Sequence, residues 1–347
     1  MDPMKRAALF ALLIPALCAG PATAWGPDAH RLILRTAIDS LAPASRRPYE
    51  GRWNDLKRAV VAPDAHNTVP EEACRHWVDI EKTDPAYLSG LHKALDAAYG
   101  DAGWTGEDAR TVGAGVDAAF FADNAPPWAA ARSGPLWAAL PPTITAFRER
   151  YGRDELFIGI VTYQPYLFAR ALYRALANAD SRKTALMAGL LAHYASDLTV
   201  PFHVTSNYRG QFTGNLGFND KERGDIHARF ETGFTKARSS ALAAQLKAAL
   251  KGWRPSPIDA GAITPRAVSL AREGYSALPA LLEADLGACR KADPRTAWNA
   301  WVAEAEPAFG PAAAARMEAA TRFVAVLLES AGRPDLFPVP SGKIGGP

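Results

Sequence analysis

Hydrophobic and polar positions recur along this chain mainly with the period of an α-helix. Over residues 154–178, apolar side chains lie three and four positions apart, and the same spacing returns over residues 182–198. Strict alternation of apolar and polar residues, which would indicate strands, is scarce. We therefore predict an all-α fold. The predicted helices cover residues 31–41, 154–178, 182–198, 224–234, 236–253, 264–286, 297–306 and 311–330.

Segments rich in glycine and proline separate these predicted helices. Residues 123–142 carry several prolines and form a predicted connection, and residues 204–223 form a predicted long surface loop. Long loops inside compact domains usually serve a function. We find neither an internal repeat nor a clear linker, so residues 25–337 are predicted to form one multi-helix domain, followed by a disordered tail at 338–347.

The N-terminal segment has the organisation of a secretory signal peptide. Two basic residues precede an apolar run at 7–19, and the sequence Ala-Thr-Ala at 22–24 offers a cleavage site lined by small residues. The apolar run is too short to cross a bilayer as a stable helix. We therefore interpret residues 1–24 as a cleaved signal peptide, with Trp25 as the new N-terminus, and expect a secreted or periplasmic protein.

Composition narrows the possible classes of protein. The chain has 347 residues, of which 48% are hydrophobic and 22% charged, as is typical of a globular protein. Its formal net charge of +3 is too small for a nucleic-acid clamp held by charge alone. Beyond the predicted signal peptide two cysteines remain, Cys74 and Cys289, and their positions in the sequence leave open whether they pair in an oxidising compartment.

Candidate chemistry concentrates in the histidines. His193 and Asp197 lie four positions apart on a predicted helix, His227 and Glu231 repeat that spacing, and His203 follows a Pro-Phe break. A single His–carboxylate pair is more often an ordinary surface or core pair. Together, however, these residues fall on an otherwise apolar stretch, where buried charges need partners, and a metal ion is one such partner. Imidazole and carboxylate without thiolate fit a catalytic zinc site.

The same residues carry a resemblance to the zinc-dependent phospholipase C / S1-P1 nuclease superfamily. The matching motifs are Trp-Gly-Pro-Asp-Ala-His at 25–30, Ala-Pro-Asp at 62–64, Arg-His-Trp-Val-Asp at 75–79, His-Tyr-Ala-Ser-Asp at 193–197, Pro-Phe-His at 201–203 and His-Ala-Arg-Phe-Glu at 227–231, with weaker similarity at 315–319. The resemblance implies an all-α secreted protein with three zinc ions in a cleft. His66 and His92 match no family position and are interpreted as surface residues.

The resemblance also implies how the ligands divide among three Zn²⁺ ions. One ion would be held by Asp64, His76, His193 and Asp197; a second by His30, Asp197 and the amino nitrogen and carbonyl oxygen of Trp25; a third by His203, His227 and Glu231. Asp64 is then the candidate catalytic base, although Asp55 lies nearby in the sequence. No stable protein partner is implied, and we expect a monomer.

Different motifs in the sequence indicate different substrates. Glu231 as the last ligand resembles the phospholipase C branch, whereas the short spacing from Trp25 to His30 and the Gly214-Asn215 pair resemble the nuclease branch. Our interpretation favours a phospholipase C acting on phospholipid. The alternative is a single-strand nuclease or 3′-nucleotidase, and a second alternative is an inactive zinc-binding protein, against which the intact Asp64 speaks.

Overall fold

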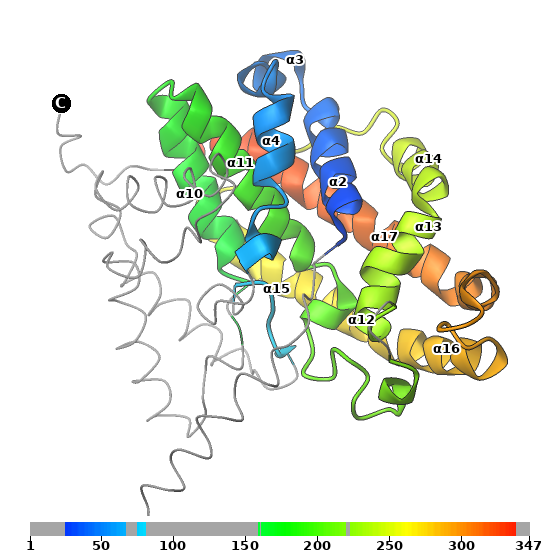
Figure 1. Ribbon diagram of the computed structural model, residues 1–347. Coiled ribbons are helices and arrows are strands. Elements are labelled where there is room, and N and C mark those ends of the chain that lie inside the picture. Colours follow the sequence, from blue (N-terminus) through cyan, green and yellow to red (C-terminus); the bar gives the residue numbers. More distant parts are fainter. Residues whose placement is uncertain (1–24, 67–74, 81–158, 160, 220–222, 338–347) are drawn as a thin grey trace, which may run out of the picture.

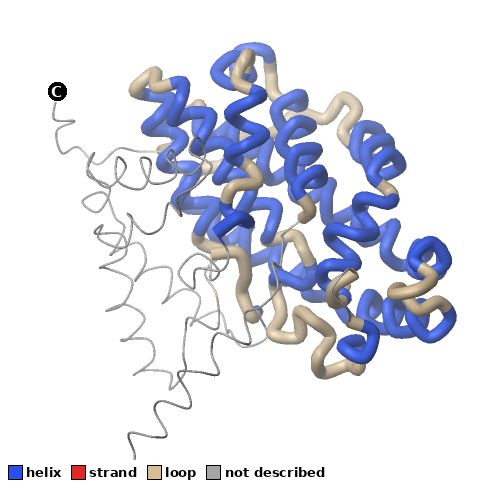
Figure 2. The backbone as a smooth tube through the Cα atoms, in the orientation of Figure 1, coloured by secondary structure: helices blue, strands red, loops and turns tan. Residues whose placement is uncertain are grey.

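Helices make up all the regular elements in the part of the chain that the structure describes, so the predicted all-α fold is confirmed (Figure 1, Figure 2). The computed structural model describes residues 25–66, 75–80, 159, 161–219 and 223–337. The α-helices are α2 (Pro27–Ser40), α3 (Pro43–Arg46), α4 (Trp53–Ala59), α10 (Gln164–Ala177), α11 (Ser181–Asp197), α12 (Ile226–Ala228), α13 (Thr235–Ala237), α14 (Ser239–Ala249), α15 (Ala260–Ser276), α16 (Leu278–Lys291) and α17 (Trp298–Ala331). The 3₁₀-helices are η1 (Arg47–Tyr49), η2 (Pro63–His66), η5 (Pro201–His203), η6 (Asn215–Phe218) and η8 (Pro334–Leu336), and η7 (Arg229–Phe234) is a π-helix.

Several predictions fall outside the described residues. These are the signal peptide at 1–24, the connection at 123–142, the tail at 338–347, the first residues of the helix predicted over 154–178, and the residues Cys74 and His92.

Helix α11 is the centre of the fold. It packs against α10, α4, α2 and α17, and every residue from Thr184 to Asp197 is buried. In Figure 1, α2, α4, α10 and α11 stand side by side and α17 crosses behind them. The Asp180 side chain caps α11 by accepting a hydrogen bond from the Lys183 amide at 3.0 Å. Because α11 is enclosed on all sides, polar side chains on it must find partners inside the protein.

Close contact between α11 and α4 depends on Gly189. A Cβ atom at this position would collide with Ala59 and lie 3.0 Å from the Val60 amide nitrogen. Helix α4 has no counterpart among the predicted helices, because its seven residues, about two turns, are too few to show a clear period. The contact matters for the site, since Val60 follows α4 directly and its carbonyl faces α11.

Prolines lie at two differences between the predicted and the observed helices. One predicted helix is divided, and two others are joined. The periodicity predicts one helix over 264–286, but α15 ends and α16 begins near Pro279, which has no N–H to continue the hydrogen-bond ladder. Conversely, the helices predicted over 297–306 and 311–330 form the single helix α17, which contains Pro307 and Pro311. Its contacts with α2, α11 and α16 hold it together across both prolines.

The remaining predictions are close to the observed elements. Helix α2 begins at Pro27, a residue suited to the first turn, rather than at residue 31. Helix α10 likewise begins only at Gln164, beside Pro165. The helix predicted over 236–253 is divided into α13 and α14. Among the described residues, no helix is both long enough and apolar enough to span a bilayer.

Candidate metal centre

Asp197, the last residue of α11, lies among four imidazoles. Its Oδ2 atom is 2.9 Å from His76 Nδ1, 3.3 Å from His193 Nε2 and 3.9 Å from His203 Nδ1, and its Oδ1 atom is 3.5 Å from His30 Nε2. Asp197, His30 and His193 are fully buried. His76, His193 and Asp197 therefore offer ligand atoms close enough together to hold one metal ion.

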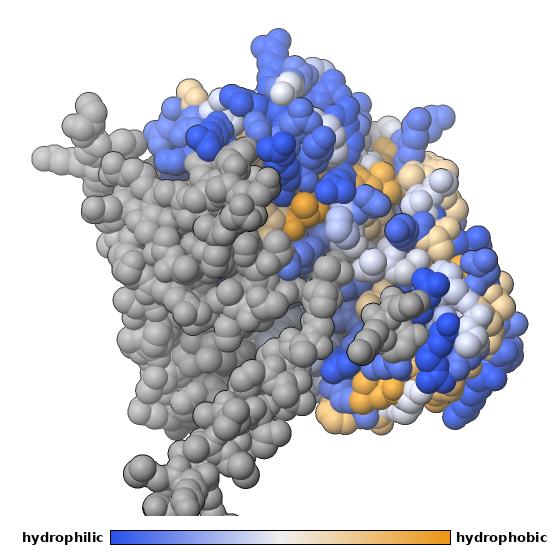
Figure 3. All heavy atoms as spheres, in the orientation of Figure 1, coloured by the Kyte–Doolittle hydropathy of each residue, from blue (hydrophilic) through white to orange (hydrophobic). Residues whose placement is uncertain are grey.

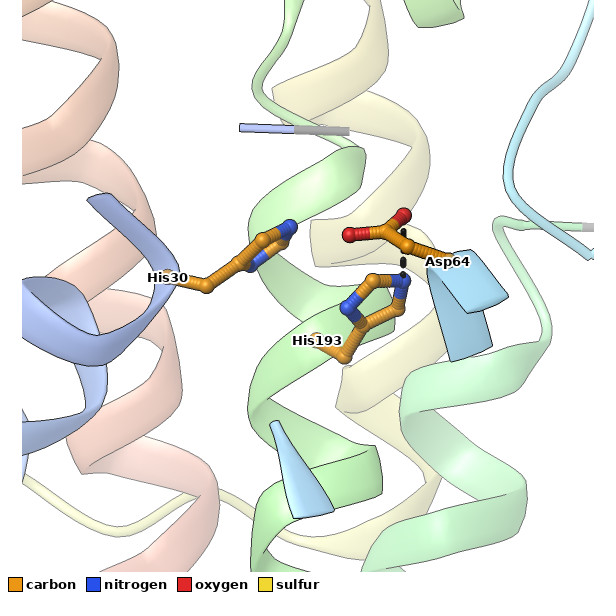
Figure 4. Close-up of side chains that lie close together, drawn as sticks. All are labelled: His30, Asp64 and His193. Carbon is orange, nitrogen blue, oxygen red and sulfur yellow. Dashed lines mark ion pairs between the residues drawn. The ribbon is translucent and has the colours of Figure 1, made fainter. Parts of the chain in front are cut away.

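Asp64 joins this cluster from the other side. Figure 4 shows His30, Asp64 and His193 pointing toward one another from α2, η2 and α11. His193 Nε2 lies 3.7 Å from Asp64 Oδ1, and the rings of His30 and His193 stack with centroids 4.4 Å apart. These three side chains also offer ligand atoms within 4.8 Å of one another. Asp55 instead pairs with Arg52 at 3.3 Å in the first turn of α4, so the structure distinguishes the two candidate acids.

A second cluster consists of His203, His227 and Glu231. Glu231 Oε2 lies 2.8 Å from His227 Nε2 and 3.4 Å from His203 Nε2, and all three side chains are buried. Their ligand atoms also meet the 4.8 Å criterion for a shared ion. His203 belongs to η5, while the other two residues lie on α12 and η7.

Hydrogen bonds to the outer ring nitrogens turn the inner nitrogens toward the clusters. His193 Nδ1 lies 2.8 Å from the Val60 carbonyl, and His203 Nδ1 lies 2.7 Å from the His76 carbonyl, so both rings donate from Nδ1. Ser196 gives its own proton to α11 carbonyls, so its oxygen accepts from His30 Nδ1 at 2.8 Å. In each ring Nε2 then keeps its lone pair for a metal, which is the arrangement found around protein-bound metal ions.

Six inner polar atoms of these clusters lack hydrogen-bond partners. Within the described residues, these buried atoms are His30 Nε2, His203 Nε2, His227 Nε2, Asp197 Oδ1 and both carboxylate oxygens of Glu231. Each unsatisfied buried group costs about 1–3 kcal/mol, and carboxylate oxygens facing nitrogen lone pairs repel each other. A cation between them would satisfy all of these atoms at once. The residues present therefore fit bound metal ions.

Burial favours the neutral form of these imidazole and carboxyl groups. It lowers the pKa of His30 and of His227 to about 4 and also lowers the pKa of His193 and His203, so the imidazoles are neutral near pH 7. Neutral imidazole is the form that binds a metal. Burial also raises the pKa of Glu231 to about 8 and raises that of Asp197.

Trp25 is fixed beside both clusters. Its buried indole N–H donates to the Ser196 carbonyl at 3.1 Å and to the Thr199 hydroxyl at 3.2 Å. The amide of Gly26 donates to the Glu231 carbonyl at 3.1 Å. The main chain at Trp25 is thus held between α11 and η7. Metal binding through its amino nitrogen and carbonyl oxygen stays a prediction.

A buried ion pair that the sequence did not reveal supports the segment carrying Glu231. Arg229 Nε and Nη2 donate to the two Asp285 oxygens at 2.9 and 2.6 Å, and both side chains are fully buried. Asn215 donates to Asp285 at 2.7 Å and to the Leu282 carbonyl at 3.0 Å. This network ties η7 to α16 and η6. An arginine placed between two candidate ligands in the motif at 227–231 was the available signal, because such an arginine needs a buried acid.

The structure groups the predicted ligands somewhat differently from the resemblance. It brings His203, His227 and Glu231 together as one set. It places Asp64 with His30 and His193 in a second set, and His76 with His193 and Asp197 in a third. His193 therefore belongs to both of these sets. His66 is the last residue of η2, two positions after Asp64, and His92 lies outside the described residues. The division of ligands among individual ions stays a prediction.

Comparisons with known proteins show a distant structural likeness. No protein-family model matches the sequence, and no curated protein matches it. Among solved structures the chain is similar to the alpha toxin from Clostridium Absonum, at 12% sequence identity and a TM-score of 0.38. The match covers 91% of this chain and 66% of the toxin chain, slightly under two thirds of the toxin's length.

Proposed function

We propose that this chain is a zinc-dependent phosphoester hydrolase of the phospholipase C type. The observation that supports it is the pair of adjoining buried clusters, built from imidazole and carboxylate with no thiolate. Within the described residues, the atoms of these clusters without a hydrogen-bond partner include His30 Nε2, His203 Nε2, His227 Nε2, Asp197 Oδ1 and both oxygens of Glu231. This mixture of ligands is typical of catalytic rather than structural zinc.

The proposed ligands are those that the resemblance implies, namely Trp25, His30, Asp64, His76, His193, Asp197, His203, His227 and Glu231. Three zinc ions held by them would acidify a water molecule and offset the negative charge on a phosphoryl group. The protein's own contribution is rigid placement, because buried helices hold the ligands and hydrogen bonds to Val60, His76 and Ser196 fix three of the rings.

Asp64 is the proposed general base. It is 9% exposed, whereas Asp197 and Glu231, the other carboxylates of the two clusters, are fully buried. Its carboxylate lies against His30 and His193, so a water molecule held by metal ions among these side chains would be within its reach. Its role would be to accept the proton of the attacking water as the phosphoester bond breaks. Such a base has no purpose in a protein that only stores zinc.

The structure bears on the choice of substrate through Asn215. The amide of this residue donates to the Leu282 carbonyl and to Asp285, and its side chain is buried. The Gly214-Asn215 pair, which resembles the nuclease branch, thus also has a structural role in this chain. Glu231 continues to favour phospholipid as the substrate. Single-stranded nucleic acid or a 3′-nucleotide is the alternative, since the spacing from Trp25 to His30 supports it.

Parallel assays on one preparation test this proposal. The protein, secreted or periplasmic and monomeric in our proposal, is assayed with phosphatidylcholine, single-stranded DNA and RNA, and its zinc content is measured by mass spectrometry. We expect about three zinc ions per chain, release of phosphocholine and loss of that activity on chelation. Hydrolysis of nucleic acid alone would select the alternative. If the zinc-loaded protein hydrolyses none of these substrates, the interpretation that remains is an inactive zinc-binding protein.

A further inference from the structure

Exposed hydrophobic side chains concentrate on one loop of the molecule. Among the described residues, the large hydrophobic side chains that are exposed are Tyr208, Phe212, Leu216 and Tyr275. Three of these four lie within nine residues, on the loop that connects η5 to α12 and carries η6. Phe212 is 74% exposed, far more than the other three, none of which exceeds 39%. In Figure 3, hydrophobic side chains gather at the lower edge of the visible face, over this loop.

The loop is held firmly, so the exposure of Phe212 is a built feature. The Phe212 amide donates to Asn207 Oδ1 at 2.9 Å, and the Gly210 amide donates to the Asn207 carbonyl at 2.9 Å. Gly210 and Gly214 both adopt positive φ angles, which turn the chain sharply on either side of Phe212. Asn215 then anchors the far end of the loop to α16. An aromatic side chain presented on a fixed support can bind a surface without first losing loop entropy.

The loop lies next to the second metal-binding cluster. The ring of Tyr208 meets the ring of His227 edge to face, with centroids 6.2 Å apart. At the other end of the loop, the Phe218 carbonyl accepts a hydrogen bond from Arg229, two residues before Glu231. A molecule that contacts Phe212 and Leu216 is therefore brought close to the candidate site.

Charge favours one kind of partner for this loop. Over residues 204–225 the sequence contains three basic and three acidic side chains, so the loop has no formal net charge, and the guanidinium of Arg209 pairs with Asp225 at 2.7 Å. A polyanion such as single-stranded nucleic acid is usually held by unpaired cations beside stacking aromatics. Leu216 also offers no flat face on which a base could stack. An aromatic and an aliphatic side chain without net charge suit instead the boundary between headgroups and acyl chains of a zwitterionic lipid surface.

We propose that Phe212 and Leu216 form a docking surface for a phosphatidylcholine membrane or micelle, which positions the metal-binding clusters against the lipid phosphates. The phosphoester bond of a phospholipid lies at the same boundary that these side chains would enter, so docking and hydrolysis require the same orientation of the protein. The inference rests on the proposed phospholipase C function. It adds that the protein acts on phospholipid molecules assembled in a membrane or micelle.

The test compares Phe212→Ser with the wild type and with Tyr275→Ser, a matched control that removes the exposed aromatic ring outside the loop. Binding to vesicles of pure phosphatidylcholine is measured by flotation, and turnover is measured on the same vesicles and on short-chain phosphatidylcholine below its micelle concentration. We expect Phe212→Ser to lower vesicle binding, and the ratio of vesicle turnover to monomer turnover, by roughly tenfold, the lower end for burial of one phenylalanine side chain. Tyr275→Ser should match the wild type, and the circular dichroism spectra should coincide.

Two different results would overturn two different claims. Equal vesicle binding by the wild type and Phe212→Ser, or no vesicle binding by the wild type, would remove the docking surface even if phosphatidylcholine is hydrolysed. No hydrolysis of phosphatidylcholine in either form would remove the proposed function. Loss of oligonucleotide binding in Phe212→Ser, with vesicle binding unchanged, would overturn the lipid proposal and reassign the loop to nucleic acid.

Discussion

Asp197 Oδ2 lies 2.9 Å from His76 Nδ1, although the two residues are 121 positions apart in the sequence. Asp197 is the last residue of α11, where the helix dipole already places partial negative charge. A buried carboxylate at that end is unfavourable unless positive charge lies beside it. The imidazoles of His30 and His193 do not supply it near pH 7, because burial lowers the pKa of both rings. A bound cation supplies the missing charge. The predictions below follow from this arrangement.

Chelation should destabilise the protein. Ligands from α2, η2, α11, η5 and η7 meet at the clusters, so ions bound there connect elements far apart in the chain and bind only the folded state. An ion at a thousand times its dissociation constant stabilises a protein by about 4 kcal/mol, which corresponds here to a fall in Tm of roughly 5–15 °C on removal. Differential scanning calorimetry with EDTA, and then with added zinc, should show the fall and its reversal. A Tm unchanged after verified removal of the metal would contradict the prediction.

The metal-free protein should be most stable near pH 6.5. The folded pKa of His30 and His227 is lowered from 6.5 to about 4, so their contribution is present above 6.5 and lost as the pH falls toward 4. The folded pKa of Glu231 is raised from 4.5 to about 8, so its contribution is present below 4.5 and lost as the pH rises toward 8.

Zinc should reverse the alkaline half of this profile, because bound metal replaces the proton on Glu231 and stabilises more strongly as the pH rises from 6.5 to 8. Urea denaturation at pH 5, 6.5 and 8, with and without zinc, measures both effects. Greater stability of the metal-free chain at pH 8 than at pH 6.5 would show that the sign is wrong.

Asp64→Asn should lower turnover on phosphatidylcholine by roughly 10²–10⁴-fold, the usual range for loss of a general base, with little change in KM. The amide keeps the shape and one ligating oxygen but cannot accept the proton. Asp55→Asn is the matched control, since Asp55 forms an exposed pair with Arg52 and should leave turnover unchanged. Zinc content is measured on both variants. Near-normal turnover in Asp64→Asn, or its full recovery with excess zinc, would reduce Asp64 to a ligand.

An additional residue before Trp25 should cost the protein one zinc ion and most of its activity. The free amino group, with an ordinary pKa near ~8, must lose its proton to bind the metal, and an amide nitrogen at that place cannot do so. The hydrogen bonds of the Trp25 indole and the Gly26 amide leave the main chain little freedom to move aside. The zinc content and the activity of a chain that begins at Trp25 are compared with those of a chain that carries one alanine before Trp25. Equal zinc content and activity would refute the role of the amino group.

Asp285→Asn should destabilise the fold by about 3–5 kcal/mol, because it leaves the Arg229 guanidinium buried without a counter-charge. Asp39→Asn breaks the exposed pair with Arg35 and should cost no more than about 1 kcal/mol. Urea denaturation gives both free energies of unfolding. If the two variants lose the same stability, the buried pair does not support η7 as described.

The sequence predicted the helices that have a long apolar stripe. It did not predict the helix boundaries that depend on tertiary contacts. Helix α11 agrees with its prediction to within one residue at each end, because its period, its cap and its following proline all indicate the same boundaries. The continuity of α17 across Pro307 and Pro311 depends on neighbours that no local pattern reveals. The π-helix η7 was equally hidden, since its widened turn is associated with contacts to Gly26 and Asp285 from distant segments.

The residues of the candidate site were predictable for a different reason. Histidine is rare in this chain, so its coincidence with acids at helical spacing is informative, and the structure gathers those residues in one buried place. The supporting residues Arg229, Asp285 and Asn215 could not be linked from sequence, because arginine, aspartate and asparagine are common and their pairing spans 70 residues. The exposure of Phe212 was likewise unpredictable, since most aromatic residues lie in the core.

The groups that orient His193 and His203 are main-chain carbonyls, those of Val60 and His76. Every amino acid carries such a carbonyl, so a substitution at position 60 changes the side chain and leaves the acceptor in place. The direction of the His193 ring is thus protected against most point mutations at the residue that sets it. Its vulnerable point lies elsewhere, at Gly189, where any side chain would push α4 away and carry the Val60 carbonyl with it. Accordingly, a conservative change of the buried Val60, such as Val60→Ile, should leave zinc binding intact, whereas Gly189→Ala should weaken it.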